Sequence, residues 1–208
     1  MGAKHESSCY HPQMPDPEEN AGRRKHSRGY LPHFDVYEAI QFVTFRLADS
    51  MPQDVLKKWR ADLEAGSIND VDFRKTIEKF LDSGYGSCNL RDVRIANDLR
   101  QTLIKWDGDR YELIAWVIMP NHVHILIRLL GENLLSDVMH SIKSYTAHQA
   151  NKLIGRTGRF WSVESFDRYI RNADHFRNTI KYIEENPVNA RLCEAPEDWE
   201  FSSASGSD

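Results

Sequence analysis

The feature that most constrains the fold is a long apolar stretch, residues 111–130, which a Pro-Asn pair divides in two. Tyr111–Met119 and His122–Leu129 are both rich in β-branched and other apolar residues, a composition that favours strands. Met119-Pro120-Asn121 between them is typical of a tight turn. The stretch is therefore expected to form an antiparallel hairpin, and the polar residues within it exclude a membrane-spanning segment.

Strand and helix patterns flank this hairpin on both sides. The run Val36–Leu47 is apolar and β-rich, which predicts another strand. Residues 49–106 carry apolar side chains at helical spacing in three places, and this block is expected to be an insertion or an elaborated crossover. After the hairpin, a helix is expected to begin with a cap at Asn133 or Ser136 and to run to about Leu153.

The last third of the chain shows weaker signals. Short extended pieces are expected around residues 159–161 and 169–170. Asp174 is expected to cap a helix that runs through Glu185, because apolar residues recur there at helical spacing. Asn186-Pro187 is expected to end that helix, since the residue before proline disfavours helical backbone.

Composition and charge place the chain among ordinary globular proteins. Hydrophobic residues make up 40% of the 208 residues and charged residues 28%. The net charge of −4 is not typical of a nucleic-acid binder. A local basic face is still possible, because residues 152–191 hold eight Lys or Arg against five Asp or Glu. Cys9, Cys88 and Cys193 lie far apart, which predicts reduced thiols and a cytoplasmic protein.

The first 30 residues differ in character from the rest of the chain. They are polar and rich in proline, which predicts a flexible arm, and they lack the apolar core of a secretory signal. Arg23 and Arg24 belong to a basic cluster at the end of this arm. The cluster could follow a DNA backbone, or it could serve only to keep the chain in solution.

His122-Val123-His124 is the first candidate for chemistry. Alternate residues of a strand point to the same face, so the two imidazoles are expected to lie about 7 Å apart along one face. Two imidazoles at this spacing can bind one metal ion such as Mn, Zn, Fe or Cu. The spacing alone also occurs in surface histidines of a half-exposed strand.

The helix predicted after the hairpin supplies a second candidate group. Its apolar stripe continues to Tyr145 and Gln149, which are neighbours at i and i+4. If this helix packs on the sheet near the histidines, Gln149 can give a third metal ligand and Tyr145 can reach a phosphate on the metal. His148, on nearly the same face, is an alternative ligand or base. A buried tyrosine with a hydrogen-bonded hydroxyl is the other interpretation of Tyr145.

These groups together match what cleavage of a phosphodiester requires. A metal neutralises charge on the non-bridging oxygens, and a tyrosine can form a covalent intermediate that conserves the bond for rejoining. Two other functions are also considered. One is a DNA-hairpin binding module without catalysis, and the other is a hydrolase in which His122 and His124 activate water at a metal.

Several spaced motifs resemble one known family. The segment 119–127, MPNHVHILI, resembles the HUH motif of the Y1 (IS200-like) transposases, in which U is a bulky apolar residue. Tyr145 and Gln149 resemble the catalytic tyrosine and helix-borne metal ligand of that family. Residues 160–171 and 182–190 resemble the REP-associated tyrosine transposase branch, and the match runs from about Leu31 to Ser203.

The resemblance implies a fold and an activity. The expected fold is α+β, a ferredoxin-like sandwich whose antiparallel sheet carries the HUH motif on a central strand, plus a helical insertion over 49–106. The expected reaction is cleavage and rejoining of single-stranded, hairpin-forming DNA through a 5′-phosphotyrosine at Tyr145. Mg²⁺ or Mn²⁺ is the expected metal, bound by His122, His124 and Gln149. A monomer is expected, and a dimer with shared active sites is the alternative.

The remaining expectations concern DNA contacts and domain limits. Arginine side chains suit phosphates and aromatic faces stack on unpaired bases, so a set of basic and aromatic residues near the C-terminal helix is expected to bind DNA. We expect an arm over 1–30, a catalytic domain over 31–203 and a tail over 204–208. The expected DNA contacts are Arg159, Trp161, Arg168 and Arg171, with Arg23 and Arg24 of the arm.

Overall fold

The computed structural model describes residues 24–27, 32–35 and 39–206. Its centre is a four-stranded antiparallel sheet with the strand order β4-β5-β3-β6. The strands of this sheet are β3 (Ile40–Leu47), β4 (Tyr111–Ile118), β5 (His122–Leu129) and β6 (Trp161–Tyr169). The helices are α1 (Gln53–Glu64), α2 (Asp70–Asp82), α3 (Val93–Lys105), α4 (Leu135–Leu153) and α5 (Ala173–Asn189).

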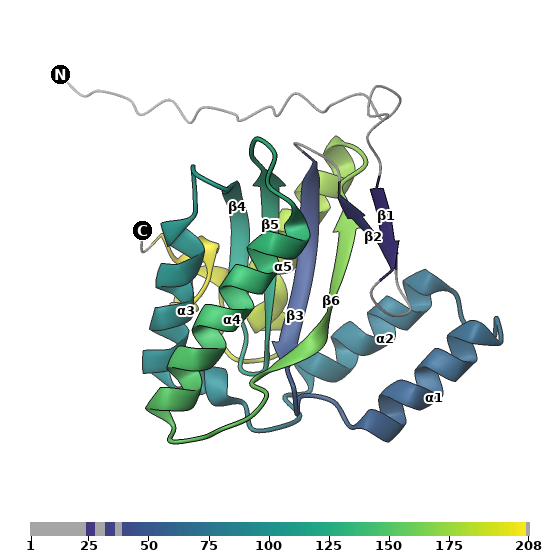
Figure 1. Ribbon diagram of the computed structural model, residues 1–208, viewed down its shortest axis with the longest axis horizontal. Helices are drawn as coiled ribbons and strands as arrows, with labels where there is room; N and C mark the ends of the chain where they lie inside the picture. Colours follow the sequence, from purple (N-terminus) through teal and green to yellow (C-terminus); the bar gives the residue numbers. More distant parts are fainter. Residues whose placement is uncertain (1–23, 28–31, 36–38, 207–208) are drawn as a thin grey trace.

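The connections between these elements give a ferredoxin-like sandwich. Strand β3 leads through helices to β4, the hairpin β4–β5 follows, and α4 leads from β5 to β6. The first and third strands of this sandwich, β3 and β5, therefore lie at the centre of the sheet, with β4 and β6 at its edges. Helices α3 and α4 pack side by side on one face, and α5 covers the opposite face (Figure 1). The predicted fold class and the predicted β4–β5 hairpin are confirmed.

Alternation along β5 sends its side chains into two separate cores. Val123, Ile125 and Ile127 join the core beneath α3 and α4. Leu126 joins the core beneath α5, so His122 and His124, which share its parity, point to the α5 face. The predicted placement of both histidines on one face of a central strand agrees with the structure.

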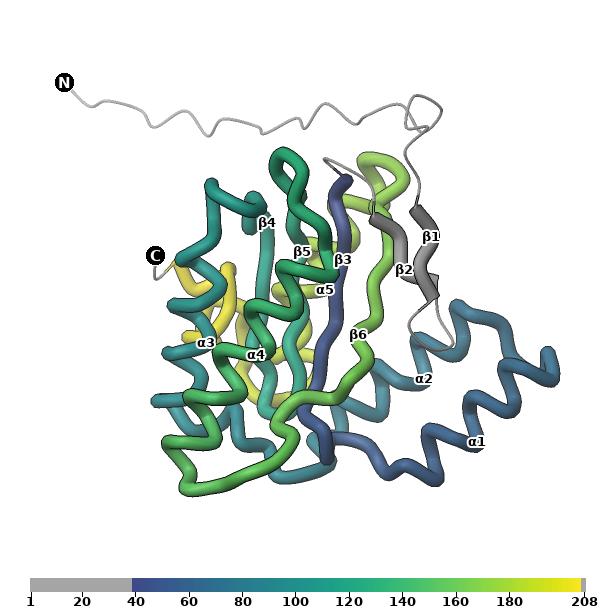
Figure 2. The backbone as a smooth tube through the Cα atoms, in the orientation of Figure 1, coloured from purple at the N-terminus to yellow at the C-terminus, as the bar shows by residue number. Residues whose placement is uncertain are grey.

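Helices α1 and α2 form a third core of their own. Leu56, Phe73, Ile77 and Leu81 pack together there, and the pair lies to one side of the sheet beyond β6 (Figures 1 and 2). By contrast, α3 packs on α4 and is the first crossover helix of the sandwich. The predicted insertion over 49–106 is therefore too long, because only α1 and α2 lie outside the sandwich.

Several predicted element limits differ from the structure. The two extended pieces predicted around 159–161 and 169–170 lie at the ends of one strand, β6, which pairs with β3 on both sides of a register shift between Phe45 and Leu47. Helix α5 is capped by Asn172 and continues past Pro187 to Asn189. Proline removes a single N–H and is tolerated there because it lies in the last turn, where the following amides still bond to Asn186 and Pro187 carbonyls.

The N-terminal region is described only in part. Residues 24–27 form strand β1 (Arg24–Ser27), which pairs with β2 (Pro32–Asp35) in an antiparallel ladder. Four residues of the expected arm therefore form a strand, and its other residues, 1–23 and 28–30, lie outside the described part of the chain. Within the described ranges, none of the helices has the length and hydropathy needed to cross a bilayer.

Candidate active site

His122 and His124 lie on β5, on the face of the sheet that α5 covers. Both side chains are 0% exposed, and their Nε2 atoms are 3.1 Å apart. Burial lowers the pKa of His122 to about 3, and it lowers the pKa of His124 well below its usual value. Both rings are therefore neutral near pH 7, which is the form that binds a metal.

A second set of hydrogen bonds orients the two imidazoles. The Asn121 amide donates to the carbonyls of Leu81 and Tyr85, which leaves its Oδ1 facing His122 Nδ1 at 2.7 Å. An amide oxygen only accepts, so Nδ1 of His122 carries the proton and its Nε2 keeps a lone pair. Thr44 Oγ1 lies 2.8 Å from His124 Nδ1 in the same way. Asn121 thus orients the imidazole of His122.

Helix α5 brings Tyr182 and Asn186 to the histidines. The Tyr182 ring lies 5.4 Å from the His124 ring and 5.9 Å from Phe42, centroid to centroid. Asn186, one helical turn later, is 1% exposed, and its Oδ1 has no hydrogen-bond partner. A buried amide oxygen of this kind is costly unless a donor or a cation meets it. The phenol and the unsatisfied amide are therefore directed at the site from one helix.

Helix α2 contributes two carboxylates from the other side. Asp82 Oδ1 lies 3.6 Å from His122 Nε2, and the Asn186 side chain lies within hydrogen-bonding reach of the Asp82 carboxylate. Burial, with help from Glu78, raises the pKa of Asp82 to about 6, and burial also raises the pKa of Glu78. Glu78 lies within hydrogen-bonding reach of the Tyr182 hydroxyl, although the two are not aligned for a bond of ordinary geometry. Burial and these two carboxylates raise the pKa of Tyr182.

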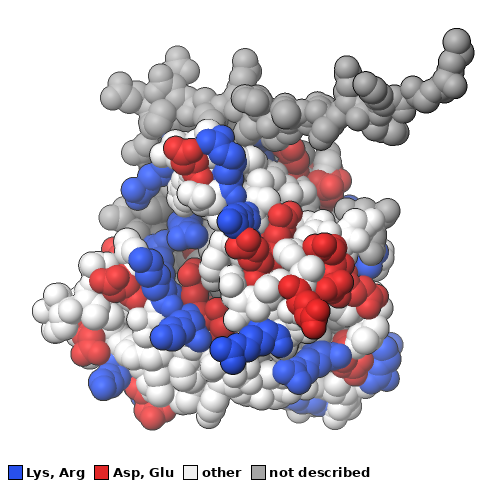
Figure 3. Space-filling model, turned by 180° about the vertical axis from the view of Figure 1, so that it is seen from behind, with Lys and Arg blue, Asp and Glu red and all other residues white. Residues whose placement is uncertain are grey.

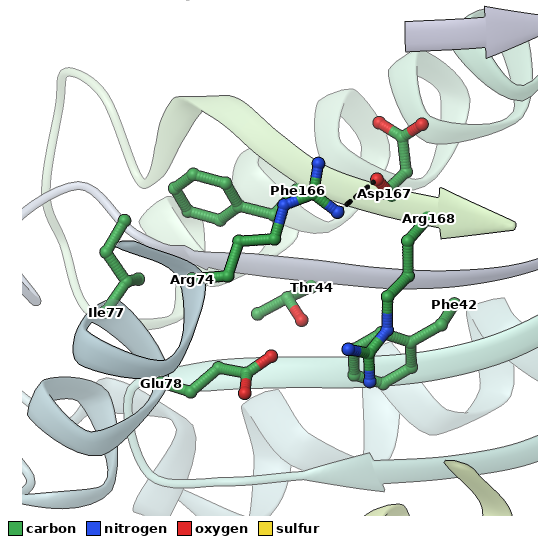
Figure 4. Close-up of a pocket in the computed structure, with 8 residues that line it drawn as sticks. All are labelled: Phe42, Thr44, Arg74, Ile77, Glu78, Phe166, Asp167 and Arg168. Atoms are coloured by element: carbon green, nitrogen blue, oxygen red, sulfur yellow. Dashed lines mark hydrogen bonds between the residues drawn. The ribbon is translucent and has the colours of Figure 1, made fainter. Parts of the chain in front are cut away.

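Cationic side chains complete the surroundings of the site. Arg168 of β6 lies over the Phe42 ring at 4.7 Å, and Arg74 of α2 donates to the Asp167 carbonyl at 3.3 Å. Figure 4 shows both guanidinium groups and Glu78 around a small pocket above Thr44. Arg168 is thus the predicted DNA-contact residue that the structure places beside the histidines.

The donors of this site fit a divalent ion. Two imidazole nitrogens 3.1 Å apart can share one ion, because ligand bonds of about 2.1 Å place neighbouring donors about 3 Å apart. The unpartnered Oδ1 of Asn186 is a suitable third donor. In the described part of the chain, no three His, Cys, Asp or Glu side chains form a metal cluster as they stand. We therefore consider the amide oxygen of Asn186 as the third donor beside the two histidines.

Tyr145 and Gln149, the predicted nucleophile and third ligand, lie elsewhere. Helix α4 packs through Ile142 and its neighbours on the sheet face opposite the histidines. Tyr145 points outward and is 51% exposed. The sheet lies between α4 and α5 (Figure 1), and alternation along β5 places His122 and His124 on the α5 face. The structure therefore contradicts the predicted meeting of Tyr145 and Gln149 with the histidines within one chain, and His148 is exposed on the same helix.

The other predicted DNA contacts are dispersed. Trp161 belongs to the core beneath α4, where its Nε1 donates to Thr146 Oγ1 at 2.9 Å, so it is not available to stack on a base. Arg159 and Arg171 are exposed. Arg23 lies outside the described residues, and Arg24 begins strand β1.

The residues that the sequence interpretation missed carry a recognisable signal. Tyr182 and Asn186 have the same i, i+4 spacing of a phenol and an amide that drew attention to Tyr145 and Gln149. Both helices follow the histidine strand, and the sequence does not state which face of the sheet each one covers. The choice between the two pairs therefore required the packing of α4 and α5.

Comparison with known proteins agrees with the motifs. Residues 90–186, which include both histidines and both tyrosines, match the family model described as "Transposase IS200 like". A Haemophilus influenzae protein named a REP-associated tyrosine transposase is 25% identical over 103 residues. The match spans 45% of this chain and 58% of that protein, so the chain covers little more than half of this relative's length.

Two solved structures are also similar. A REP-associated tyrosine transposase bound to a REP hairpin is 21% identical, with a TM-score of 0.54 over 86% of this chain and 84% of that chain. A Deinococcus radiodurans protein named a transposase is 16% identical, with a TM-score of 0.31 over 78% and 98%. The first structure shares the fold described above. The family match and the Haemophilus protein confirm the resemblance of this chain to the IS200-like transposases and to their REP-associated branch.

Proposed function

We propose that the chain cleaves and rejoins single-stranded DNA, with Tyr182 as the nucleophile and His122, His124 and Asn186 as ligands of a divalent ion. Mg²⁺ or Mn²⁺ is the expected ion. The observation that supports this most strongly is the position of Tyr182, whose ring lies 5.4 Å from His124 while its helix carries the unpartnered oxygen of Asn186. Tyr182 takes the role that the sequence interpretation gave to Tyr145.

In the first step, Tyr182 Oη attacks a DNA phosphorus. The O–P bond of a 5′-phosphotyrosine forms, the bond to the 3′ oxygen breaks, and a 3′ hydroxyl leaves. Glu78 lies beside the Tyr182 hydroxyl and accepts its proton, and the departing 3′ oxygen takes up a proton from water. The raised pKa of Glu78 suits this role, because a base works best when its pKa lies near the working pH. Attack by a 3′ hydroxyl on the phosphotyrosine then rejoins the strand and returns the proton to Tyr182.

The surroundings supply the charge that this step needs. A bound divalent ion would withdraw electrons from the non-bridging oxygens of the phosphate. Arg168, which lies over Phe42 at the edge of the site, is placed to bind a phosphate of the entering strand. Asn121 and Thr44 hold the imidazole rings in the orientation that directs both Nε2 atoms to one point.

The proposed substrate is hairpin-forming single-stranded DNA. The solved neighbour with the same fold is bound to a REP hairpin, and we extend that ligand class to this chain. On the face of the molecule opposite to that of Figure 1, Lys and Arg side chains line a hollow next to the α1–α2 pair, and acidic side chains lie within the hollow (Figure 3). This local arrangement is compatible with DNA binding even though the net charge of the chain is −4.

A covalent-adduct assay tests this proposal. The protein is incubated with labelled hairpin DNA and Mn²⁺ and analysed on a denaturing gel. We expect a protein–DNA adduct that Tyr182→Phe abolishes and that Tyr145→Phe, an exposed tyrosine of the same chain, leaves unchanged. Binding without cleavage would support a hairpin-binding module, and cleavage without an adduct would support a water-activating hydrolase. Either result would overturn the proposal.

A further inference from the structure

The last residue of α2, Asp82, has an unusual environment. Its Oδ1 is shielded from solvent, accepts no hydrogen bond and lies 3.6 Å from Nε2 of His122. The imidazole is neutral, so this contact is not an ion pair. A shielded carboxylate oxygen without a donor is costly, and a cation is the usual partner for it.

A second unpartnered oxygen lies in the same place. Asn186 is 1% exposed, its Oδ1 has no hydrogen-bond partner, and its side chain lies within hydrogen-bonding reach of Asp82. The carboxylate and the amide are therefore in contact, beside two imidazole nitrogens 3.1 Å apart. The four donors come from three elements, α2, β5 and α5.

We propose that Asp82 is a further ligand of the divalent ion, added to the site by the α1–α2 pair. This inference rests on the proposed function, since it concerns the same ion. A carboxylate adds a negative charge to a ligand set that is otherwise neutral, which raises the affinity for a dication. Two nitrogens and two oxygens also suit Mn²⁺, which accepts both imidazole and carboxylate ligands.

The α1–α2 pair is held in a position that allows this role. Arg60 of α1 forms an ion pair with Glu164 of β6, and Phe73 of α2 packs against Phe166 of the same strand. Asn121 also binds the Leu81 carbonyl directly before Asp82. The end of α2 is thus fixed next to β5, with Asp82 Oδ1 3.6 Å from His122 Nε2.

Binding of Mn²⁺ to the full chain tests this inference without relying on activity. Isothermal titration and the electron paramagnetic resonance spectrum of bound Mn²⁺ are measured for the wild type, Asp82→Asn and Asp54→Asn. Asp54 is exposed on α1, and Asp54→Asn is the matched control because it removes the same negative charge at a position outside the proposed site. We expect Asp82→Asn to weaken Mn²⁺ binding at least tenfold and to change the spectrum, while Asp54→Asn stays within twofold of the wild type.

Two results would overturn the inference: Asp82→Asn binding Mn²⁺ as the wild type does, or the wild type binding no Mn²⁺. Circular dichroism checks that the variant is folded. If Asp82→Asn does not fold, Asp82→Glu, which keeps the charge on a longer side chain, is expected to bind Mn²⁺ with an altered spectrum, and an unaltered spectrum would count against ligation.

The same samples separate this inference from the proposed function. If the wild type forms the Tyr182 adduct but Asp82→Asn keeps its Mn²⁺ affinity, only the role of Asp82 is rejected. If Mn²⁺ binding depends on Asp82 but no adduct forms with hairpin DNA, the strand-transfer function is rejected and the ligand assignment stands.

Discussion

At the scale of single residues, the buried histidines have a consequence for stability. His122 and His124 are neutral in the folded chain because burial lowers the pKa of each. In the unfolded chain both have a pKa of about 6.5, so the unfolded state binds protons first as the pH falls. The free energy of unfolding therefore decreases below pH 6.5.

This decrease is measurable. Each histidine is expected to reduce the free energy of unfolding by about 1.3 kcal/mol between pH 7 and pH 5.5. Asp82 opposes part of this effect, because its raised pKa lets the folded state gain a proton in the same range. Urea unfolding in the presence of a chelator is the measurement. A His122→Gln, His124→Gln variant is expected to show a flatter pH profile, and an unchanged profile would contradict the buried neutral pair.

Glu78 is the residue whose proposed role is most specific to catalysis. Glu78→Gln keeps the size of the side chain but removes the proposed acceptor of the Tyr182 proton. We expect adduct formation with hairpin DNA to slow by about 100-fold or more at neutral pH, with Mn²⁺ affinity nearly unchanged. Single-turnover kinetics measure the rate. Full activity of this variant would show that a group other than Glu78 accepts the Tyr182 proton.

The histidine pair could be predicted from the sequence, whereas the nucleophile could not. His122 and His124 are two residues apart in a strand, and alternate residues of a strand point to the same face, so the sequence alone places both imidazoles on one face. Tyr145 and Tyr182 are each followed by an amide four residues later, and both lie on amphipathic helices. Only the three-dimensional packing of α4 and α5 distinguishes them.

At the scale of elements, α4 is attached to the sheet through Trp161. The indole packs in the core beneath α4 and donates a hydrogen bond to Thr146. Trp161→Ala is therefore expected to lower the free energy of unfolding by about 3–5 kcal/mol, while DNA affinity of the molecules that remain folded stays close to that of the wild type. Urea titration and hairpin binding are measured on the same sample. A stable variant with weak DNA binding would restore the predicted stacking role.

The helices with a clear apolar periodicity could be predicted from the sequence, whereas their places in the fold could not. The helices α1, α2 and α3 follow apolar periodicity, which is local information. Assigning α3 to the sandwich and only α1–α2 to the insertion depends on contacts between distant segments. Strand β6 was predicted as two fragments because its polar centre, residues 162–168, lacks the alternation of a half-buried strand.

At the scale of the whole molecule, all four residues of the proposed site belong to one chain. His122, His124, Tyr182 and Asn186 lie together without a second copy. Mixing two inactive variants, Tyr182→Phe and His124→Ala, is therefore expected to restore no activity, because each active site needs both residues from one chain. Recovery of activity on mixing would indicate sites shared between two chains.

The most direct measurement is the identity of the tyrosine that carries the DNA. The covalent adduct is digested with protease and nuclease, and the nucleotide-linked peptide is sequenced by mass spectrometry. We predict that the linked residue is Tyr182, on the helix that covers the histidine face of the sheet. A nucleotide on Tyr145 would contradict the site described here and would require α4 of another chain to reach the two histidines.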